Sequence, residues 1–143
     1  MLYFAYGSNL NFNQMQKRCS DAKFLKKGFI NGYIFVYDGF SIKWQGAVGN
    51  IVPSEKKRVW GGIFEISENC LSKLDICEGY PSVYDRREFE LWDEDGGRCK
   101  AIAYLREGRT IAKPGKDYEG VILQGAKDCG LPEDYVNKYL KAY

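Results

Sequence analysis

The segment LYFAYGSNL, residues 2–10, decides how the fold begins: an aromatic-rich stretch runs directly into Gly7-Ser8-Asn9. Aromatic residues favour strands, and residues 11–18 have a helix-forming composition, so we predict a strand, a tight turn and a helix. Such a glycine turn leaves backbone N–H groups without partners in the chain, and these can bind an anion. For the segment alone, a turn that only caps the helix is the simpler interpretation.

The middle of the chain predicts a meander of strands followed by one helix. Residues 28–37, 41–48 and 58–66 read as strands, the first two paired across Asp38-Gly39. Ser67 is a plausible N-cap, and Gly79 followed by Pro81 is a conventional helix end. This pattern places Glu78 in the last turn of the helix.

The second half of the chain predicts a hairpin and two more helices. Residues 83–92 and 98–105 flank an acidic, glycine-containing loop suited to a hairpin. Residues 118–129 carry apolar side chains at helical spacing, and a second short helix runs from Pro132 to about Leu140. No repeat or linker divides the chain, so we expect residues 1–143 to form a single α+β domain.

The composition is that of a soluble globular protein, with 45% hydrophobic and 28% charged residues. A net charge of +2 is too small for the basic face that nucleic-acid binding needs. No apolar stretch is long enough for a membrane helix, and the first residues lack the features of a signal peptide. We therefore expect a cytoplasmic protein without nucleic-acid or membrane partners.

Histidine is absent, which excludes a Ser-His-Asp triad, a Cys-His pair and a histidine-ligated metal. A general acid or base must then be a carboxylate, tyrosine, lysine or cysteine, and a carboxylate is the best candidate. The five cysteines are odd in number and contain no Cys-x-x-Cys pair, which argues against a disulfide framework and a zinc knuckle. We expect mostly buried thiols and no metal.

Glu78 is the candidate acid/base. It falls at the negative end of a helix dipole, where a carboxylate is not stabilised, so its pKa should rise. Partial burial beside aromatic residues would raise the pKa further. The simpler interpretation is an exposed glutamate that pairs with Lys73 or Arg86.

Three segments taken together resemble the γ-glutamylcyclotransferase family, which includes AIG2-like proteins. They are Tyr3–Leu10, Leu74–Tyr84 and Pro114–Tyr118, and residues 125–135 are similar to the family's C-terminal helical segment. The resemblance implies a small mixed β-barrel-like sheet wrapped by helices. It also implies a cofactor-independent enzyme, of the lyase or acyltransferase type, and allows a homodimer.

The activity that the resemblance implies is conversion of a γ-glutamyl amino acid or amine to 5-oxoproline and a free amine, with Glu78 as the acid/base. The residues assigned to binding this small-molecule substrate are Tyr6, Gly7, Ser8, Asn9, Leu10, Tyr84 and Tyr118. The chemistry agrees, because one carboxylate can take a proton from the attacking α-amine and return it to the departing amine.

Two other functions stay open at this point: a non-catalytic binding module of the same fold, and a γ-glutamyl hydrolase or transferase. The leaving group is also open between an amino acid, a polyamine, a modified lysine and a carrier-bound amine. The Glu78-Gly79-Tyr80-Pro81 form is more similar to branches that act on γ-glutamyl amines or acyl carriers.

Overall fold

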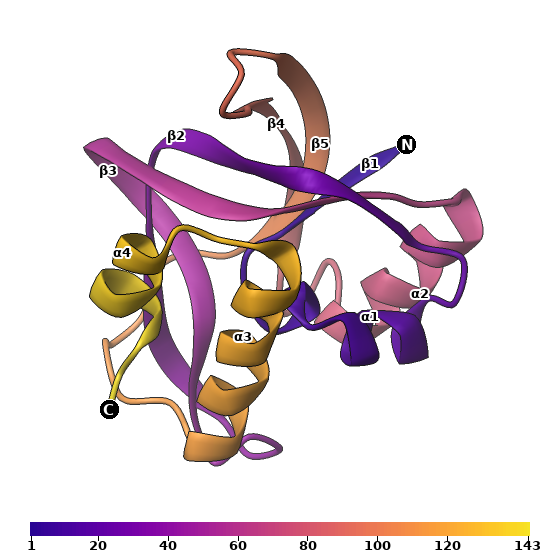
Figure 1. Cartoon of the computed structure of the whole chain (residues 1–143). Coiled ribbons are helices and arrows are strands. Elements are labelled where there is room, and N and C mark those ends of the chain that lie inside the picture. The colour runs from indigo at the N-terminus through magenta and orange to yellow at the C-terminus, as the bar shows by residue number, and fades with distance from the viewer.

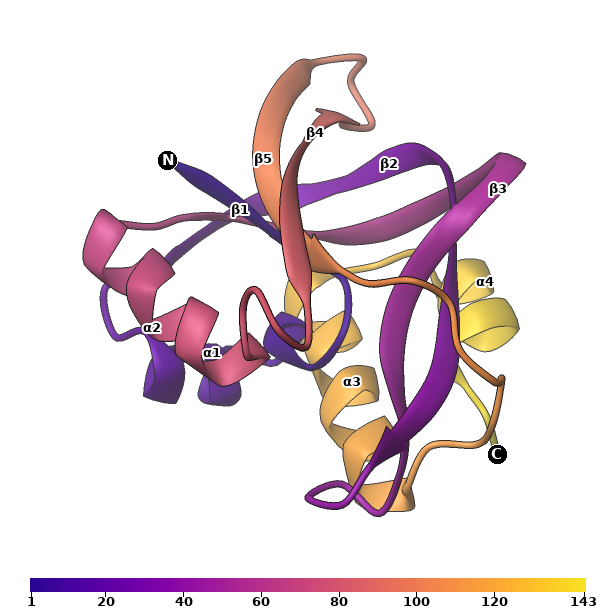
Figure 2. The same cartoon turned by 180° about the vertical axis from the view of Figure 1, so that it is seen from behind.

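The computed structural model describes residues 1–143 and forms a closed five-stranded barrel with helices on its outside (Figures 1 and 2). The order of strands around the barrel is β1-β3-β2-β4-β5. The strands are β1 (Leu2–Ala5), β2 (Lys23–Ser41), β3 (Gly46–Glu65), β4 (Asp85–Trp92) and β5 (Arg98–Leu105). The α+β class and the barrel-like sheet are confirmed.

The helical elements match the predicted ones closely. They are η1 (Ser8–Leu10), α1 (Phe12–Arg18), α2 (Glu68–Glu78), α3 (Lys116–Cys129), α4 (Glu133–Tyr135) and the π-helical turn η2 (Val136–Leu140). Asn11 caps α1 through its side chain, which accepts from the Gln14 N–H, and Ser67 caps α2 by accepting from the Cys70 N–H. Local capping chemistry therefore fixes where both helices begin.

The predicted meander of three strands is wrong, because β2 and β3 are two long strands joined at residues 42–45. Three register shifts interrupt their pairing, and the last lies between Asp38 and Ser41, where the sequence suggested a turn. A bulge lets a strand bend and twist without ending. Glycine with a positive φ, as at Gly39, is compatible with either a bulge or a turn.

Asp38 is not a turn residue but the centre of a buried polar network. Its carboxylate accepts from Arg106 Nη1 at 2.6 Å, from Asn50 Nδ2 at 3.2 Å and from the Arg109 N–H at 2.9 Å. The Asp38 side chain is fully buried, and that of Arg106 is 6% exposed. The network holds the segment after β5 against the long β2–β3 hairpin.

Closure of the barrel is uneven, because two of its strand contacts consist of a single residue pair. β1 runs parallel to β5 at the pair Tyr3 and Ile102, whereas β2 meets β4 only at Phe29 and Trp92. Beyond that pair the β2–β3 hairpin and the β4–β5 hairpin separate (Figure 2). Helix α3 lies below the barrel beside η1, and α1 and α2 lie next to each other at one end (Figures 1 and 2).

Helix α3 packs directly on the backbone of the glycine turn. A Cβ at Gly125 would collide with the backbone of Leu10 and Asn11, so glycine is required for this close approach. The Asn11 side chain donates to the Val121 carbonyl at 3.2 Å and ties the two segments together. The N-terminal end of α3, with Tyr118, is thereby held at the turn.

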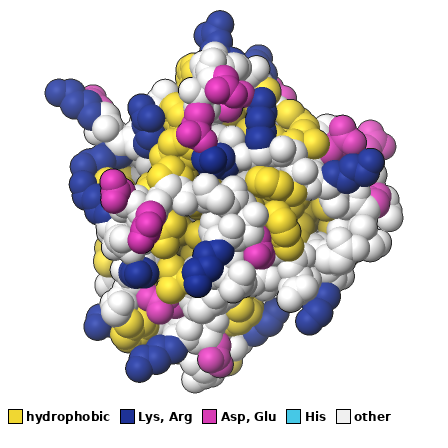
Figure 3. Space-filling model, viewed as in Figure 1, with side chains coloured by type: hydrophobic (Ala, Val, Ile, Leu, Met, Phe, Trp, Pro, Cys, Tyr) yellow, Lys and Arg dark blue, Asp and Glu magenta, His cyan; other side chains and the backbone are white.

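Acidic and basic side chains alternate over the surface shown in Figure 3, with small apolar areas between them. On that face the basic residues form no continuous stripe, in line with the small net charge of +2. None of the helices is long and apolar enough to cross a membrane.

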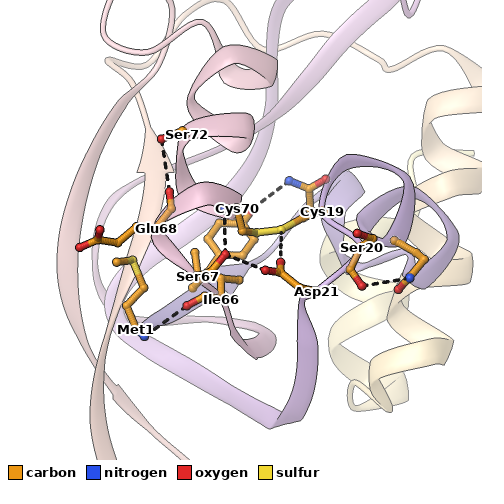
Figure 4. Close-up of a disulfide and its surroundings, with 12 residues drawn as sticks. Met1, Cys19, Ser20, Asp21, Ile66, Ser67, Glu68, Cys70 and Ser72 are labelled. Carbon is orange, nitrogen blue, oxygen red and sulfur yellow. Dashed lines mark hydrogen bonds between the residues drawn. A yellow bond between two sulfur atoms is a disulfide. The ribbon is translucent and has the colours of Figure 1, made fainter.

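The expectation of mostly buried thiols is wrong, because two cysteines form a disulfide and only one of the other three is buried. Cys19, at the end of α1, and Cys70, in the first turn of α2, form a disulfide (Figure 4). They are 51 residues apart in sequence, and only the side-by-side placement of the two helices brings them together. Of the three free cysteines, Cys129 is buried, Cys99 is half-buried and Cys77 is exposed.

The buried Asp38–Arg106 pair generates a stability prediction. Asp38→Ala leaves a buried guanidinium without its partner, which typically costs about 3–5 kcal/mol. We expect a loss of this size in the free energy of unfolding, measured by urea denaturation. The control is Glu90→Ala, which breaks the exposed pair with Arg98 and should cost less than about 1 kcal/mol. Equal, small losses for both variants would contradict the importance of the network.

Candidate active site

A cavity of about 360 Å³ opens where the glycine turn, the end of α2 and the start of α3 meet. Seven of the eight residues predicted from the sequence line it: Tyr6, Gly7, Ser8, Asn9, Glu78, Tyr84 and Tyr118. The eighth, Leu10, lies in the core and does not line the cavity. Segments separated by about a hundred residues thus converge on one pocket.

Glu78 occupies the last position of α2, as predicted, and Gly79 ends the helix in the left-handed conformation. The Glu78 side chain is 20% exposed and lies 4.0 Å from Arg18 Nη1. Burial raises the pKa of the Glu78 carboxyl, and the positive charge of Arg18 partly opposes that rise. The group is therefore a carboxyl that exchanges its proton more readily near neutral pH than an exposed glutamate does.

The simpler interpretation, pairing of Glu78 with Lys73 or Arg86, is wrong. Arg86 Nη1 instead donates to Asp75 Oδ1 at 2.6 Å, and the Asp75 carboxylate also accepts from the Tyr104 hydroxyl at 2.6 Å. These bonds tie α2 to the β4–β5 hairpin one turn before Glu78. They fix the end of the helix, and Glu78 itself lines the cavity.

The glycine turn presents backbone at the cavity, but not at every predicted position. The Leu10 N–H donates to the Gly7 carbonyl at 3.0 Å, so it is not available to a ligand, and this part of the prediction is wrong. The N–H groups of Gly7, Ser8 and Asn9 have no acceptor in the chain, as is usual where a helix begins. These three predicted amides remain for an anionic or carbonyl group.

Asn9 acts as a connector within the site. Its buried side chain donates to the Tyr3 hydroxyl at 2.9 Å and accepts from Gln14 Nε2 at 3.0 Å and Arg18 Nη1 at 3.1 Å. The turn, α1 and the Arg18 guanidinium are thus held as one unit beside Glu78.

Tyr84 and Tyr118 both bind the backbone of Gly49, one at its carbonyl and the other at its N–H. The Tyr118 hydroxyl accepts from the Gly49 N–H at 2.9 Å, and the Tyr84 hydroxyl donates to the Gly49 carbonyl at 2.8 Å. The hydroxyl proton of Tyr84 is therefore used in this hydrogen bond, whereas that of Tyr118 is free to be donated into the cavity. Burial raises the pKa of Tyr118 to about 12, so this hydroxyl stays protonated at neutral pH.

Tyr6 has a structural role at the cavity wall. Its hydroxyl donates to the Tyr104 carbonyl at 2.6 Å, a bond that joins the end of β1 to β5. The ring lines the cavity, but the hydroxyl proton is already used within the fold.

Several residues of the cavity carried no signal in the sequence. Gly49 lies near the start of the long strand β3, and Arg18 reads only as a basic residue at a helix end. The remaining charged lining residues are Lys43, Arg106 and Arg109, so four cations and one carboxylate face the cavity, counting Arg18 and Glu78. Asp38, which does not line the cavity, neutralises the charge of Arg106. The remaining charged side chains leave the lining with a net positive charge.

Comparison with known proteins identifies close relatives. The model of the AIG2-like family matches residues 58–139. The chain is 34% identical to mouse gamma-glutamylcyclotransferase and 32% identical to the human protein of that name, over 99% of this chain and 77% of each relative. A solved structure of gamma-glutamyl cyclotransferase superimposes with a TM-score of 0.93 at 31% identity, covering 99% of this chain and 86% of that one.

The family model covers more than half of the chain, and the relatives match it over almost its whole length. Together with the pocket built from the glycine turn and Glu78, these matches show that the chain is an enzyme of the γ-glutamylcyclotransferase family.

Proposed function

We propose that this enzyme converts a γ-glutamyl compound to 5-oxoproline and a free amine, with Glu78 as the only general acid/base. The observation that carries the proposal is a partly buried carboxylate placed beside free turn amides and a free tyrosine proton in one cavity. Nothing else lining the cavity is a carboxylate.

In the proposed reaction the Glu78 carboxylate accepts a proton from the substrate α-amine, which attacks the γ-carbonyl carbon. A carbon–nitrogen bond forms within the ring, and the bond to the leaving nitrogen breaks as Glu78 returns the proton to it. Atoms and charge balance without an external water or redox partner. Because the attack is intramolecular, holding the substrate in a folded conformation contributes much of the rate enhancement.

The free donors around Glu78 suit the charges that develop on the substrate. The Tyr118 hydroxyl and the N–H groups of Ser8 and Asn9 are available to the γ-carbonyl oxygen and the α-carboxylate. The net positive lining favours anionic substrates. We infer that the leaving group is a γ-glutamyl-linked amino acid, whose carboxylate meets Lys43 and Arg109, and not a polyamine.

A γ-glutamyl hydrolase is the second candidate, since Glu78 could equally activate a water molecule. The two reactions differ in product: cyclisation releases 5-oxoproline and hydrolysis releases glutamate. These products distinguish the two reactions whatever the leaving group is.

Glu78→Gln tests the acid/base assignment. The amide keeps the shape of the side chain but cannot exchange the proton, so we expect kcat for 5-oxoproline release to fall by about 10²–10⁴-fold with the fold retained. Mass spectrometry of products and circular dichroism measure the two effects. Glu68→Gln, at the exposed first turn of the same helix, should leave turnover unchanged. Near-normal turnover in Glu78→Gln would contradict the assignment of Glu78 as the acid/base.

Tyr118→Phe tests the free hydroxyl proton. We expect kcat to fall by about 10²-fold, the usual cost of removing one donor to a developing oxyanion. Tyr84→Phe is the matched comparison, because the Tyr84 hydroxyl also binds the Gly49 backbone but has no proton left for the substrate. Tyr84→Phe should lose far less turnover in steady-state assays. Equal losses would mean that both hydroxyls act only by holding Gly49.

A further inference from the structure

We propose that Arg18 is a positioning residue that keeps the Glu78 carboxylate ionised, and that the Cys19–Cys70 disulfide fixes Arg18 in that place. The inference rests on the proposed role of Glu78 as the base, which can start the reaction only in its ionised form. It adds a residue and a covalent bond to the site that the sequence motifs do not include.

Arg18 is the one charged side chain that forms an ion pair with Glu78. Nη1 of Arg18 lies 4.0 Å from Oε1 of Glu78, and the two side chains are only 16% and 20% exposed. At such low exposure water screens the attraction less than it would on the surface. Arg18 forms no ion pair with any other carboxylate.

The other titratable groups that face Glu78 are tyrosine hydroxyls from three parts of the fold. They are Tyr3 on β1, Tyr6 after it, Tyr84 before β4 and Tyr118 on α3. Burial raises the pKa of all four, so they are neutral over the range in which Glu78 ionises. The Cys77 thiol is the neighbour on α2 itself, and Lys43, Arg106 and Arg109 line the same cavity without pairing with Glu78.

Arg18 is held by two restraints of different kinds. Its Nη1 donates to Asn9 Oδ1 at 3.1 Å, which links it to the glycine turn. The next residue, Cys19, is bonded to Cys70 at the start of α2, the helix whose last residue is Glu78 (Figure 4). The disulfide therefore ties the helix that carries the cation to the helix that carries the carboxylate.

Removing the positive charge of Arg18 should raise the pKa of Glu78. Burial already raises the pKa of Glu78, and loss of the opposing cation raises it further. The acid limb of the kcat/KM profile, which reports the ionisation of the free enzyme's base, then moves to higher pH. Activity is lost on the acid side and recovered on the alkaline side.

The test compares Arg18→Gln and Arg18→Lys with the wild type in pH profiles of 5-oxoproline release. For Arg18→Gln we expect kcat/KM about tenfold or more below wild type on the acid limb, since one opposite charge changes the proton affinity of a carboxylate by at least that factor. The high-pH plateau should be retained. Arg18→Lys keeps the charge and should lie close to the wild-type profile.

Other results overturn the role of Arg18. A KM increased equally at every pH, with the acid limb unmoved, would assign Arg18 to substrate binding. An acid limb that moves as far in Arg18→Lys as in Arg18→Gln would exclude the charge as the cause. Carbon-13 NMR titration of the Glu78 carboxyl gives the same comparison without turnover, so it separates failure of this inference from failure of the proposed reaction.

The disulfide is tested by reduction of the wild-type enzyme. A dithiol reductant supplies two electrons and two protons, the sulfur–sulfur bond breaks to two thiols, and the reductant becomes a disulfide. We expect the acid limb to move in the same direction as in Arg18→Gln but less far, and Cys19→Ser to reproduce the reduced profile. Cys99→Ser, which removes a free cysteine on β5, should respond to the reductant as the wild type does.

Two outcomes overturn the part played by the disulfide. The untreated, denatured protein should titrate three thiols of its five cysteines, and a count of five would mean that the bond is absent. Superimposable pH profiles before and after reduction, with Cys19→Ser unchanged as well, would show that the bond does not fix Arg18.

Discussion

In the proposed reaction Glu78 acts as both base and acid, so its carboxylate must lose water without losing the ability to ionise. Burial at the end of α2 raises the pKa of its carboxyl, while Arg18, 4.0 Å away, opposes the rise. Too much burial would keep the group protonated, and too much positive charge would make it a weak base. The chain has no histidine, the side chain whose ordinary pKa lies nearest neutral, so the proposed reaction uses a carboxyl whose pKa is raised by burial.

Contacts between the barrel and its connecting segments hold the groups of the site in place. Asp75 ties α2 to the β4–β5 hairpin just before Glu78, and Asn9 ties the glycine turn to Arg18. Gly125 allows α3 to pack on the turn, which holds Tyr118 at the cavity. Each proposed catalytic or binding group is thus held by a hydrogen bond or a close contact with a neighbouring element, as preorganised sites require.

Much of this could be predicted from the sequence because the signals are local. The glycine turn, the Ser67 cap and the Gly79 helix end determine the position of Glu78 without reference to distant residues. What could not be predicted depends on long-range contacts. Asp38-Gly39 has the composition of a turn, and only the burial of Asp38 against Arg106 shows that the strand continues. The Cys19–Cys70 bond likewise depends on two helices meeting, which spacing along the chain does not reveal.

The central claim is that the substrate's own amine, and not water, attacks the γ-carbonyl group in this cavity. The most direct measurement is turnover of a γ-glutamyl amino acid in water labelled with oxygen-18, followed by mass spectrometry of the products. The account predicts 5-oxoproline that carries no label, because cyclisation takes no oxygen from the solvent. Glutamate that carries one labelled oxygen would contradict it and establish hydrolysis.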